Sequence, residues 1–158
     1  MRDFNLGRRF DLITIAGNSF QALLNEEYQI NCLRNIAENL EYNGYFILST
    51  RNTISDEMRT TEDFEFWHHF KDENGRLVNV YGKQNFNPSI NILHFFTKHI
   101  WSRYETISEI SLKFTDSLTL LALLETSNLK ILEVYGDFKK ETSDFTTSDN
   151  IVLICTKI

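Results

Sequence analysis

The chain has 158 residues, of which 42% are hydrophobic and 24% are charged, so its composition excludes a disordered, collagenous or coiled-coil protein. The formal net charge is −6 without any block of Lys or Arg, which argues against nucleic acid or an anionic membrane as a partner. No apolar run reaches the roughly 18 residues that a membrane-spanning helix requires, so no membrane span is expected.

The first elements in chain order are a strand, a helix and a second strand. The nearly continuous apolar run from Phe10 to Gly17 predicts a strand buried on both faces, as in a parallel sheet. Asn25 is expected to cap a helix that ends near residues 42–44, where Asn or Gly allows a left-handed backbone. Tyr45–Thr50 predicts a second buried strand. Together these elements predict a βαβ unit with a right-handed crossover.

The middle of the chain changes to an antiparallel pattern. Two strand-like runs flank Asn74-Gly75, and this dipeptide in such a position strongly indicates a hairpin. Two further segments of mixed alternation follow a turn near Pro88. The four segments are Phe64–Lys71, Arg76–Gln84, Ile90–Trp101 and Glu105–Phe114. We therefore predict an antiparallel β insertion at about 58–113 with one face exposed to water.

The end of the chain predicts one more helix and two strands. Asp116 is the expected cap of a helix over Ser117–Ser127, with four residues facing the core. These four are Leu118, Leu121, Ala122 and Leu124. A strand at Leu129–Tyr135, a turn at Gly136-Asp137, a polar loop at 139–150 and a last buried strand at Ile151–Cys155 complete the chain.

Cysteine usage and the start of the chain bear on the cellular compartment. Cys32 and Cys155 lie far apart and lack metal-type spacing, so both are expected to be reduced, buried and structural. Residues 1–4 are partly charged and contain no apolar core of a secretory signal. These features predict a cytoplasmic protein.

The histidines are not expected to hold a metal. His68 and His69 are adjacent in a predicted strand, so their side chains should lie on opposite faces of the sheet. His94 and His99 are likewise expected on opposite faces. We expect surface or cross-strand packing for these four residues, and no metal site and no catalytic residue is assigned.

Three phrases, in this order, carry a resemblance to a known family. The first is Met1–Ile13 followed by Asn18-Ser19-Phe20, the second is Leu33–Leu48, and the third is Phe114–Phe138, which contains Tyr135-Gly136-Asp137-Phe138. Together they resemble the later part of class I S-adenosylmethionine-dependent methyltransferases, over nearly the whole chain. The resemblance implies an α/β fold, with a partial Rossmann-like methyltransferase sheet that carries the antiparallel insertion.

The resemblance also implies an activity, a cofactor and site residues. It implies methyl transfer from S-adenosylmethionine to a small-molecule acceptor that it does not identify. Ligands of doubly wound sheets bind beyond the carboxyl ends of the strands, which adds Ser19 and residues 50–52 to the expected crevice. The expected cofactor-binding residues are Met1, Arg2, Ala16, Gly17 and Asn18, and the expected substrate-binding residues are Phe20, Tyr81 and Phe95.

The chain departs from the family at the cofactor fingerprint. Its six glycines form no Gly-rich phosphate-binding or cofactor-binding turn, and Tyr42 and Asn43 replace the Pro and first Gly of the usual turn before Gly44. We therefore expect weak or absent binding of S-adenosylmethionine to this chain alone. A fragment, a remnant gene and a product of internal initiation all remain open.

Two alternatives to an enzyme also remain open. One is a non-catalytic methyltransferase-like module that acts through self-association or a partner, and the other is an unrelated α/β binding protein. In the resembling family the strand equivalent to Asp11–Ala16 has a further neighbour, which this chain lacks. That strand should therefore be an open edge, and we expect the chain to form a homodimer.

Overall fold

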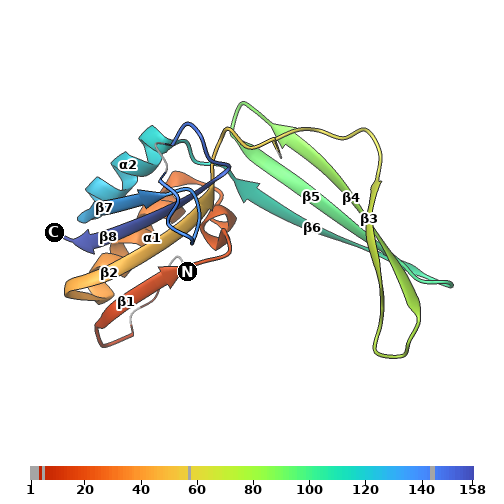
Figure 1. Cartoon of the computed structure of the whole chain (residues 1–158), viewed down its shortest axis with the longest axis horizontal. Coiled ribbons are helices and arrows are strands. Elements are labelled where there is room, and N and C mark those ends of the chain that lie inside the picture. The colour runs from red at the N-terminus through yellow and green to blue at the C-terminus, as the bar shows by residue number, and fades with distance from the viewer. Residues whose placement is uncertain (1–3, 5, 57, 143–144) are drawn as a thin grey trace. The chain divides into compact units, whose positions relative to one another are not determined.

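The computed structural model describes residues 4, 6–56, 58–142 and 145–158. The chain divides into two compact units. The first combines Met1–Asp56 with Lys113–Ile158, and the second is Glu57–Leu112. The first unit therefore contains both ends of the chain, and the second is the antiparallel insertion (Figure 1).

The first unit is built on a mixed four-stranded sheet with the strand order β1-β2-β8-β7. The strands are β1 (Phe10–Ile15), β2 (Leu40–Arg51), β7 (Leu129–Tyr135) and β8 (Asn150–Lys157). β1 and β2 run parallel and are joined by α1 (Glu26–Asn39), which confirms the predicted strand–helix–strand unit. β8 runs antiparallel to both of its neighbours. Consequently the amino end of β8 lies beside the carboxyl end of β2.

Helix α1 begins where predicted but ends earlier. The side chain of Asn25 accepts a hydrogen bond from the backbone N–H of Tyr28 at 2.9 Å, so it is the N-cap. The helix ends at Asn39 because Leu40 is fully buried and already starts β2. Asn43 has the expected left-handed backbone, with φ 66°, but it lies in an irregular part of β2 rather than at the helix end.

Helix α2 (Ser117–Thr126) has its predicted cap but a different buried face. The carboxylate of Asp116 accepts from the backbone N–H of Thr119 at 2.9 Å and from its hydroxyl at 2.7 Å. The buried residues are Leu120, Leu123 and Leu124, so only Leu124 was correctly expected. Leu118, Leu121 and Ala122 are exposed. Leucines occur around most of the circumference of this helix, so the spacing of its own apolar residues defines no single buried face.

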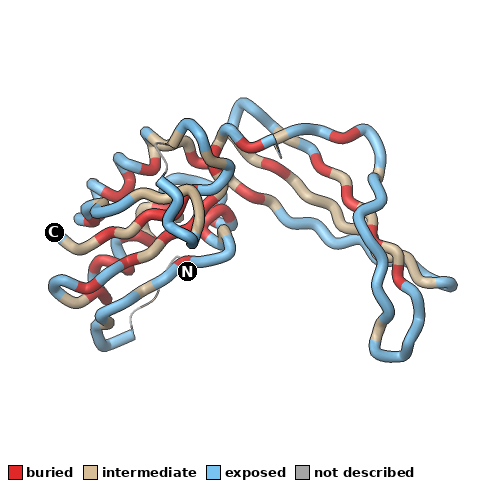
Figure 2. Tube along the Cα trace, in the orientation of Figure 1, coloured by how far each residue is buried: buried red, intermediate tan, exposed pale blue. Residues whose placement is uncertain are grey.

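The hydrophobic core lies between the two helices and one face of the sheet. α1, α2, the 3-10 helix η1 (Ser19–Ala22) and the sheet all contribute buried side chains to one cluster. Figure 2 shows this core as buried segments on β2, β8 and the helices. The prediction that β1 is buried on both faces was wrong, since Leu12 is 54% exposed whereas Ile15 is buried. Within the described part of the chain β1 is an edge strand, as expected.

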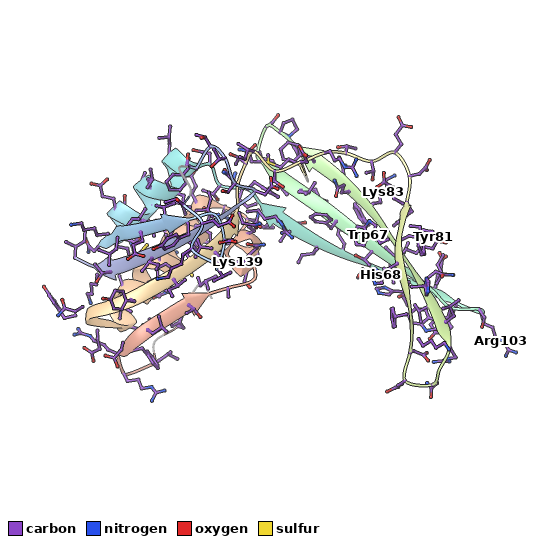
Figure 3. The ribbon with its side chains drawn as sticks, in the orientation of Figure 1. Trp67, His68, Tyr81, Lys83, Arg103 and Lys139 are labelled. Atoms are coloured by element: carbon purple, nitrogen blue, oxygen red, sulfur yellow. The ribbon has the colours of Figure 1, made fainter. Side chains whose placement is uncertain are left out.

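The insertion forms a separate four-stranded sheet with the order β3-β4-β5-β6. Its strands are β3 (Glu65–Lys71), β4 (Leu77–Asn87), β5 (Ile92–Ile100) and β6 (Glu105–Lys113). The predicted hairpin is present, because β3 and β4 pair antiparallel around a turn in which Gly75 has φ 73°. Trp67 and His68 on β3 lie beside Tyr81 on β4 (Figure 3).

Candidate binding site at the carboxyl end of β1

The chain turns sharply after β1. Gly17 and Asn18 both have left-handed backbones, with φ 63° and 59°, which is a conformation that glycine and asparagine adopt most easily. The turn is closed by Ser19, whose hydroxyl donates to the carbonyl of Ala16 at 2.8 Å. Ala16 and Gly17 are exposed and Asn18 is half-buried. The turn thus presents a small-residue surface and one amide at the carboxyl end of β1.

A polar cavity of about 220 Å³ begins at this turn. Its wall is completed by β2, by the turn after β7 and by the start of β8. The lining residues are Gly17, Asn18, Ser49, Gly136, Asp137, Phe138, Asn150 and Val152. The cavity therefore lies at the carboxyl ends of the parallel strands, where α/β proteins bind their ligands.

Asp137 contributes a carboxylate to the polar cavity. Its Oδ1 atom accepts from the backbone N–H groups of Lys139 and Glu141, at 2.8 and 3.2 Å, and so shapes the turn after β7. Among the residues that the structure describes, none donates a recorded hydrogen bond to Oδ2. Beside it, the ring of Phe138 is 68% exposed. A charged acceptor group and an aromatic surface thus meet at one wall.

Asn52 holds the opposite wall in place. This buried residue donates from its amide to the carbonyls of Phe145 and Ser148, at 2.6 and 3.0 Å. Its backbone N–H donates to the carbonyl of Asp149 at 2.7 Å. These bonds join the end of β2 to the segment before β8 and so fix the position of Asn150. Asn52 was expected at the crevice, and here it positions the chain rather than lining the cavity.

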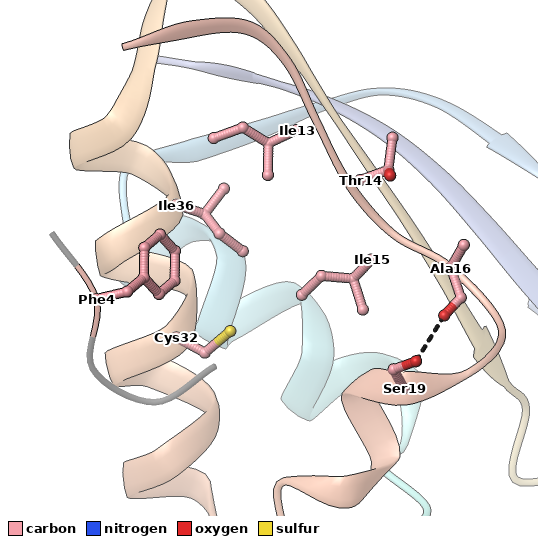
Figure 4. Close-up of a pocket in the computed structure, with 8 residues that line it drawn as sticks. All are labelled: Phe4, Ile13, Thr14, Ile15, Ala16, Ser19, Cys32 and Ile36. Atoms are coloured by element: carbon pink, nitrogen blue, oxygen red, sulfur yellow. Dashed lines mark hydrogen bonds between the residues drawn. The ribbon is translucent and has the colours of Figure 1, made fainter. Parts of the chain in front are cut away.

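A second, apolar cavity of about 330 Å³ lies on the helical side of β1 (Figure 4). Its lining residues are Phe4, Ile13, Thr14, Ile15, Ala16, Ser19, Cys32 and Ile36. None of these side chains carries a charge at neutral pH, and burial raises the pKa of the Cys32 thiol to about 11. Cys32 and Cys155 are both buried and unpaired, as expected. The end of β1 thus lies between two cavities, and of the two only the first has a carboxylate among its lining side chains.

The expected cofactor-binding residues are distributed over both cavities. Met1 and Arg2 lie outside the described residues. Ala16 lines the apolar cavity, whereas Gly17 and Asn18 line the polar one. The residues therefore share a turn but do not converge on one space.

Of the expected substrate-binding residues, Phe20 lies in the first unit, and Tyr81 and Phe95 lie in the insertion. Phe20 belongs to the hydrophobic core with 1% exposure, so its ring offers no surface to a ligand. Tyr81 lies opposite Lys98 in the β4–β5 register, and Phe95 lies opposite Gln84. Because side chains alternate along a strand, Tyr81 and Phe95 point to opposite faces of the insertion sheet. On this sheet the two rings therefore do not share one face, and their role in substrate binding stays a prediction.

Six residues of the polar cavity were not expected from the sequence to bind a ligand. They are Ser49, Gly136, Asp137, Phe138, Asn150 and Val152. Asp137 and Phe138 stand in a recognisable turn, which indicated a chain reversal but no ligand. Asn150 reaches the site only because β8 runs antiparallel to β2, and this strand direction is a property of the whole sheet.

Within residues 4, 6–56, 58–142 and 145–158, no group of three or more His, Cys, Asp or Glu side chains is placed to hold a metal ion. In the same ranges, no helix has the length and apolar character needed to cross a membrane.

No protein-family model matches the chain, and no curated protein matches it in sequence. Solved structures do match it in fold. An S-adenosylmethionine-dependent methyltransferase from Clostridium acetobutylicum superposes with a TM-score of 0.82 at 15% identity, covering 99% of this chain and 61% of its own. The CcbJ methyltransferase from Streptomyces caelestis gives 0.81 at 20% identity, covering 99% and 65%.

A third match is CalS10 from Micromonospora echinaspora, an amino pentose methyltransferase whose structure contains S-adenosylmethionine. It superposes with a TM-score of 0.74 at 14% identity, and the match covers 99% of this chain and 62% of CalS10. The chain thus has the fold of S-adenosylmethionine-dependent methyltransferases, which confirms the expected fold class. It spans between 61% and 65% of the length of these three structures.

Proposed function

We propose that these residues form the C-terminal, acceptor-binding part of an S-adenosylmethionine-dependent methyltransferase that acts on a small molecule. The observation that carries this proposal is the fold match over 99% of the chain, with TM-scores of 0.82 and 0.81 to two methyltransferases. The position of the polar cavity at the carboxyl ends of β1 and β2 supports it independently.

The described residues do not by themselves suit S-adenosylmethionine. This molecule carries a sulfonium, an amino acid group and ribose hydroxyls, all of which need polar or charged partners. Among its lining side chains, the apolar cavity beside Ala16 offers the hydroxyls of Thr14 and Ser19 and the thiol of Cys32, and it has no charged group. The sequence contains no Gly-rich turn. The donor therefore requires residues beyond these, and the expectation of weak or absent binding stands as part of the proposal.

The contribution of this chain is to bind and orient the acceptor. Holding a reactant in one orientation beside its partner removes a large entropic part of the barrier in a bimolecular reaction. Asn18, Asp137 and Asn150 offer the polar contacts for such positioning. Asn52 keeps the wall that carries Asn150 in place.

Two measurements test the proposal. Titration calorimetry of S-adenosylmethionine into the 158-residue chain is expected to give no micromolar binding. The DNA before the Met1 codon is then read, and the whole in-frame product is assayed for transfer of labelled methyl groups to a panel of small amines and alcohols. Transfer by a product that also contains a Gly-rich turn supports the proposal. A folded product with that turn and neither donor binding nor methyl transfer contradicts it.

A further inference from the structure

The sequence contains two Asn-Gly dipeptides, Asn43-Gly44 and Asn74-Gly75. We propose that Asn74, in the turn between β3 and β4, is a site of spontaneous covalent modification, at which the side-chain amide is lost and the residue becomes isoaspartate or aspartate. Asn43 has the same neighbour in sequence but is protected by the fold. The proposal concerns the described residues alone and does not depend on methyl transfer.

An asparagine that precedes a glycine can lose its amide through attack by its own backbone. The backbone nitrogen of the glycine forms a bond to the Cγ atom of the asparagine, and the bond from Cγ to the side-chain nitrogen breaks. The proton of the backbone nitrogen leaves with the side-chain nitrogen as ammonia. Water then opens the cyclic imide at either carbonyl, which gives aspartate or isoaspartate. Glycine favours the attack, because it has no Cβ atom in the way and its backbone turns freely.

The surroundings of Asn74 leave room for this reaction. Asn74 and Gly75 are both exposed, and a Cβ atom at Gly75 would have no neighbour within 4 Å. Among the residues that the structure describes, none forms a hydrogen bond with the side chain of Asn74, so its amide group can rotate towards the backbone. The reacting groups therefore face no steric barrier.

The hydrogen bonds of the turn slow the attack without preventing it. The backbone N–H of Gly75 donates to the carbonyl of Asp72 at 2.9 Å, and that of Asn74 donates to the carboxylate of Asp72 at 3.0 Å. The bond from Gly75 must break before its nitrogen reaches Cγ. Exposed turns open and close repeatedly. Because the loss of ammonia is irreversible, each opening allows some of the chains to react.

Gly44, in contrast, is held on two sides by neighbouring strands. It is buried, and a Cβ atom at this position would lie 3.0 Å from the carbonyl oxygen of Glu41 and 3.1 Å from that of Asp11 on β1. Its own carbonyl accepts from the hydroxyl of Thr156 on β8 at 3.0 Å. Its backbone therefore has no space to turn towards Asn43. Attack at Asn43 requires β2 to separate from its neighbours, although the side chain of Asn43 is exposed.

Ageing of the full 158-residue chain at neutral pH and physiological temperature over weeks tests the proposal. Trypsin releases Asn74 as the single asparagine of peptide 72–76, and Asn43 in peptide 35–51. Mass spectrometry with fragmentation measures the loss of each amide, and a sample digested before ageing corrects for loss during digestion. Asn74 is expected to react at least about tenfold faster, because more interactions must break at Asn43. Equal rates, or no reaction at Asn74, would overturn the proposal.

The unfolded chain separates the effect of the fold from that of the sequence. In guanidinium chloride neither dipeptide has a folded neighbour, so the two rates should become similar. A tenfold preference for Asn74 that persists in the unfolded chain would assign it to the adjacent residues, and would refute protection of Asn43 by the fold.

Asn74→Gln is the matched variant, because it keeps an uncharged amide but lengthens the side chain and so disfavours ring closure. Its peptide 72–76 should keep the amide. Isoaspartate lengthens the main chain of the turn, which disturbs the bond from the backbone N–H of Arg76 to the carboxylate of Asp72. The aged wild-type chain should therefore lose hydrogen-exchange protection at Arg76 in proportion to the modified fraction. Equal loss in aged Asn74→Gln would contradict the role of Asn74.

Discussion

The indole ring of Trp67 lies directly against Gly82 on the neighbouring strand, so closely that a Cβ atom at Gly82 has no room. The indole ring of Trp67 thus occupies the space in which a side chain at position 82 would lie. The register between β3 and β4 shifts between Phe66 and His68, so Trp67 stands at the irregular point of the strand pair. The glycine is therefore a packing position, since its φ is not left-handed.

Gly82→Ala is expected to displace this indole ring. The added methyl group overpacks the site, and overpacking generally costs about 1–3 kcal/mol. The lower half of this range is expected, because Trp67 is 45% exposed and can move towards solvent. A red shift of tryptophan fluorescence and a lower midpoint of urea unfolding are the measurements. In a Trp67→Ala background the same Gly82→Ala change should cost much less, and an equal cost in both backgrounds would contradict the contact.

A buried polar pair joins the two halves of the first unit. The amide of Gln29 donates to the carbonyl of Leu23 at 3.1 Å and to the hydroxyl of Thr115 at 2.8 Å. Gln29 is fully buried and Thr115 is 4% exposed. Because the residues are 86 positions apart, this bond ties the start of α1 to the segment before α2.

Thr115→Val should therefore destabilise the first unit. It replaces the hydroxyl by a methyl group of similar size and leaves part of a buried amide without a partner, which costs about 1–3 kcal/mol. The free energy of unfolding in urea measures this. Thr126→Val is the matched control, since the hydroxyl of Thr126 donates to the carbonyl of Ala122 on an exposed helix surface. Equal effects of the two variants would show that the buried pair adds nothing.

The turn between β3 and β4 should loosen in acid. The carboxylate of Asp72 accepts hydrogen bonds from the backbone N–H of Arg76, from the guanidinium of Arg76 and from the backbone N–H of Asn74. These bonds, of which the first has the largest effect, hold the pKa of Asp72 below its usual value. Asp72 also accepts from the indole N–H of Trp101 at 3.3 Å. A lowered pKa in the folded state means that the stabilisation is complete above the unfolded value of about 3.9. This stabilisation is lost as the pH falls below the unfolded pKa and through the lower pKa that Asp72 has in the folded state.

Hydrogen exchange of the amides of Asn74 and Arg76, followed from neutral pH to below pH 4, checks this behaviour. The protection should fall only in the acid part of the range. Asp72→Asn should lower the protection at neutral pH and remove its acid dependence at this turn. Acid loosening that persists unchanged in Asp72→Asn would assign the effect to other carboxylates.

The sequence predicts the features that depend on a few neighbouring residues. Asn25 and Asp116 cap the helices that follow them, and Asn74-Gly75 turns the hairpin, because each of these functions is local. The exposure of Leu118 and of Leu12 could not be predicted in this way. Helix α2 carries leucines around most of its circumference and so has no distinct apolar face. An apolar strand is buried on both sides only if neighbours cover both sides.

In the candidate site, too, the features set by neighbouring residues could be predicted and those set by the whole sheet could not. Gly17 and Asn18 follow from a strand that ends in a turn, so the carboxyl end of β1 could be located from the sequence. Asn150 and Asp137 join them only through the strand order β1-β2-β8-β7, which no local pattern specifies. The opposite orientations of Tyr81 and Phe95 depend on a cross-strand register that is set by the whole insertion sheet.

The open edge at β1 leads to the last prediction, that the 158-residue chain self-associates. Among the residues that the structure describes, β1 pairs with β2 alone, and no strand pairs with its other edge. Beside that edge, Leu12 and its register partner Tyr45 are 54% and 52% exposed, so an apolar surface adjoins the unpaired groups. Two copies related by a two-fold axis can pair their β1 strands antiparallel and cover this surface at the same time.

Sedimentation equilibrium across a dilution series measures this association, with dimers expected at high micromolar concentration. Leu12→Lys places a charge beside the edge, and charged lysines are a common means of keeping edge strands apart, so the variant should be a monomer. Leu132→Lys on β7, the other edge strand, is the matched control because Leu132 is 46% exposed, and it should still dimerise. If Leu132→Lys dissociates the dimer and Leu12→Lys does not, the contact lies at the β7 edge. A wild-type chain that stays monomeric throughout would refute self-association.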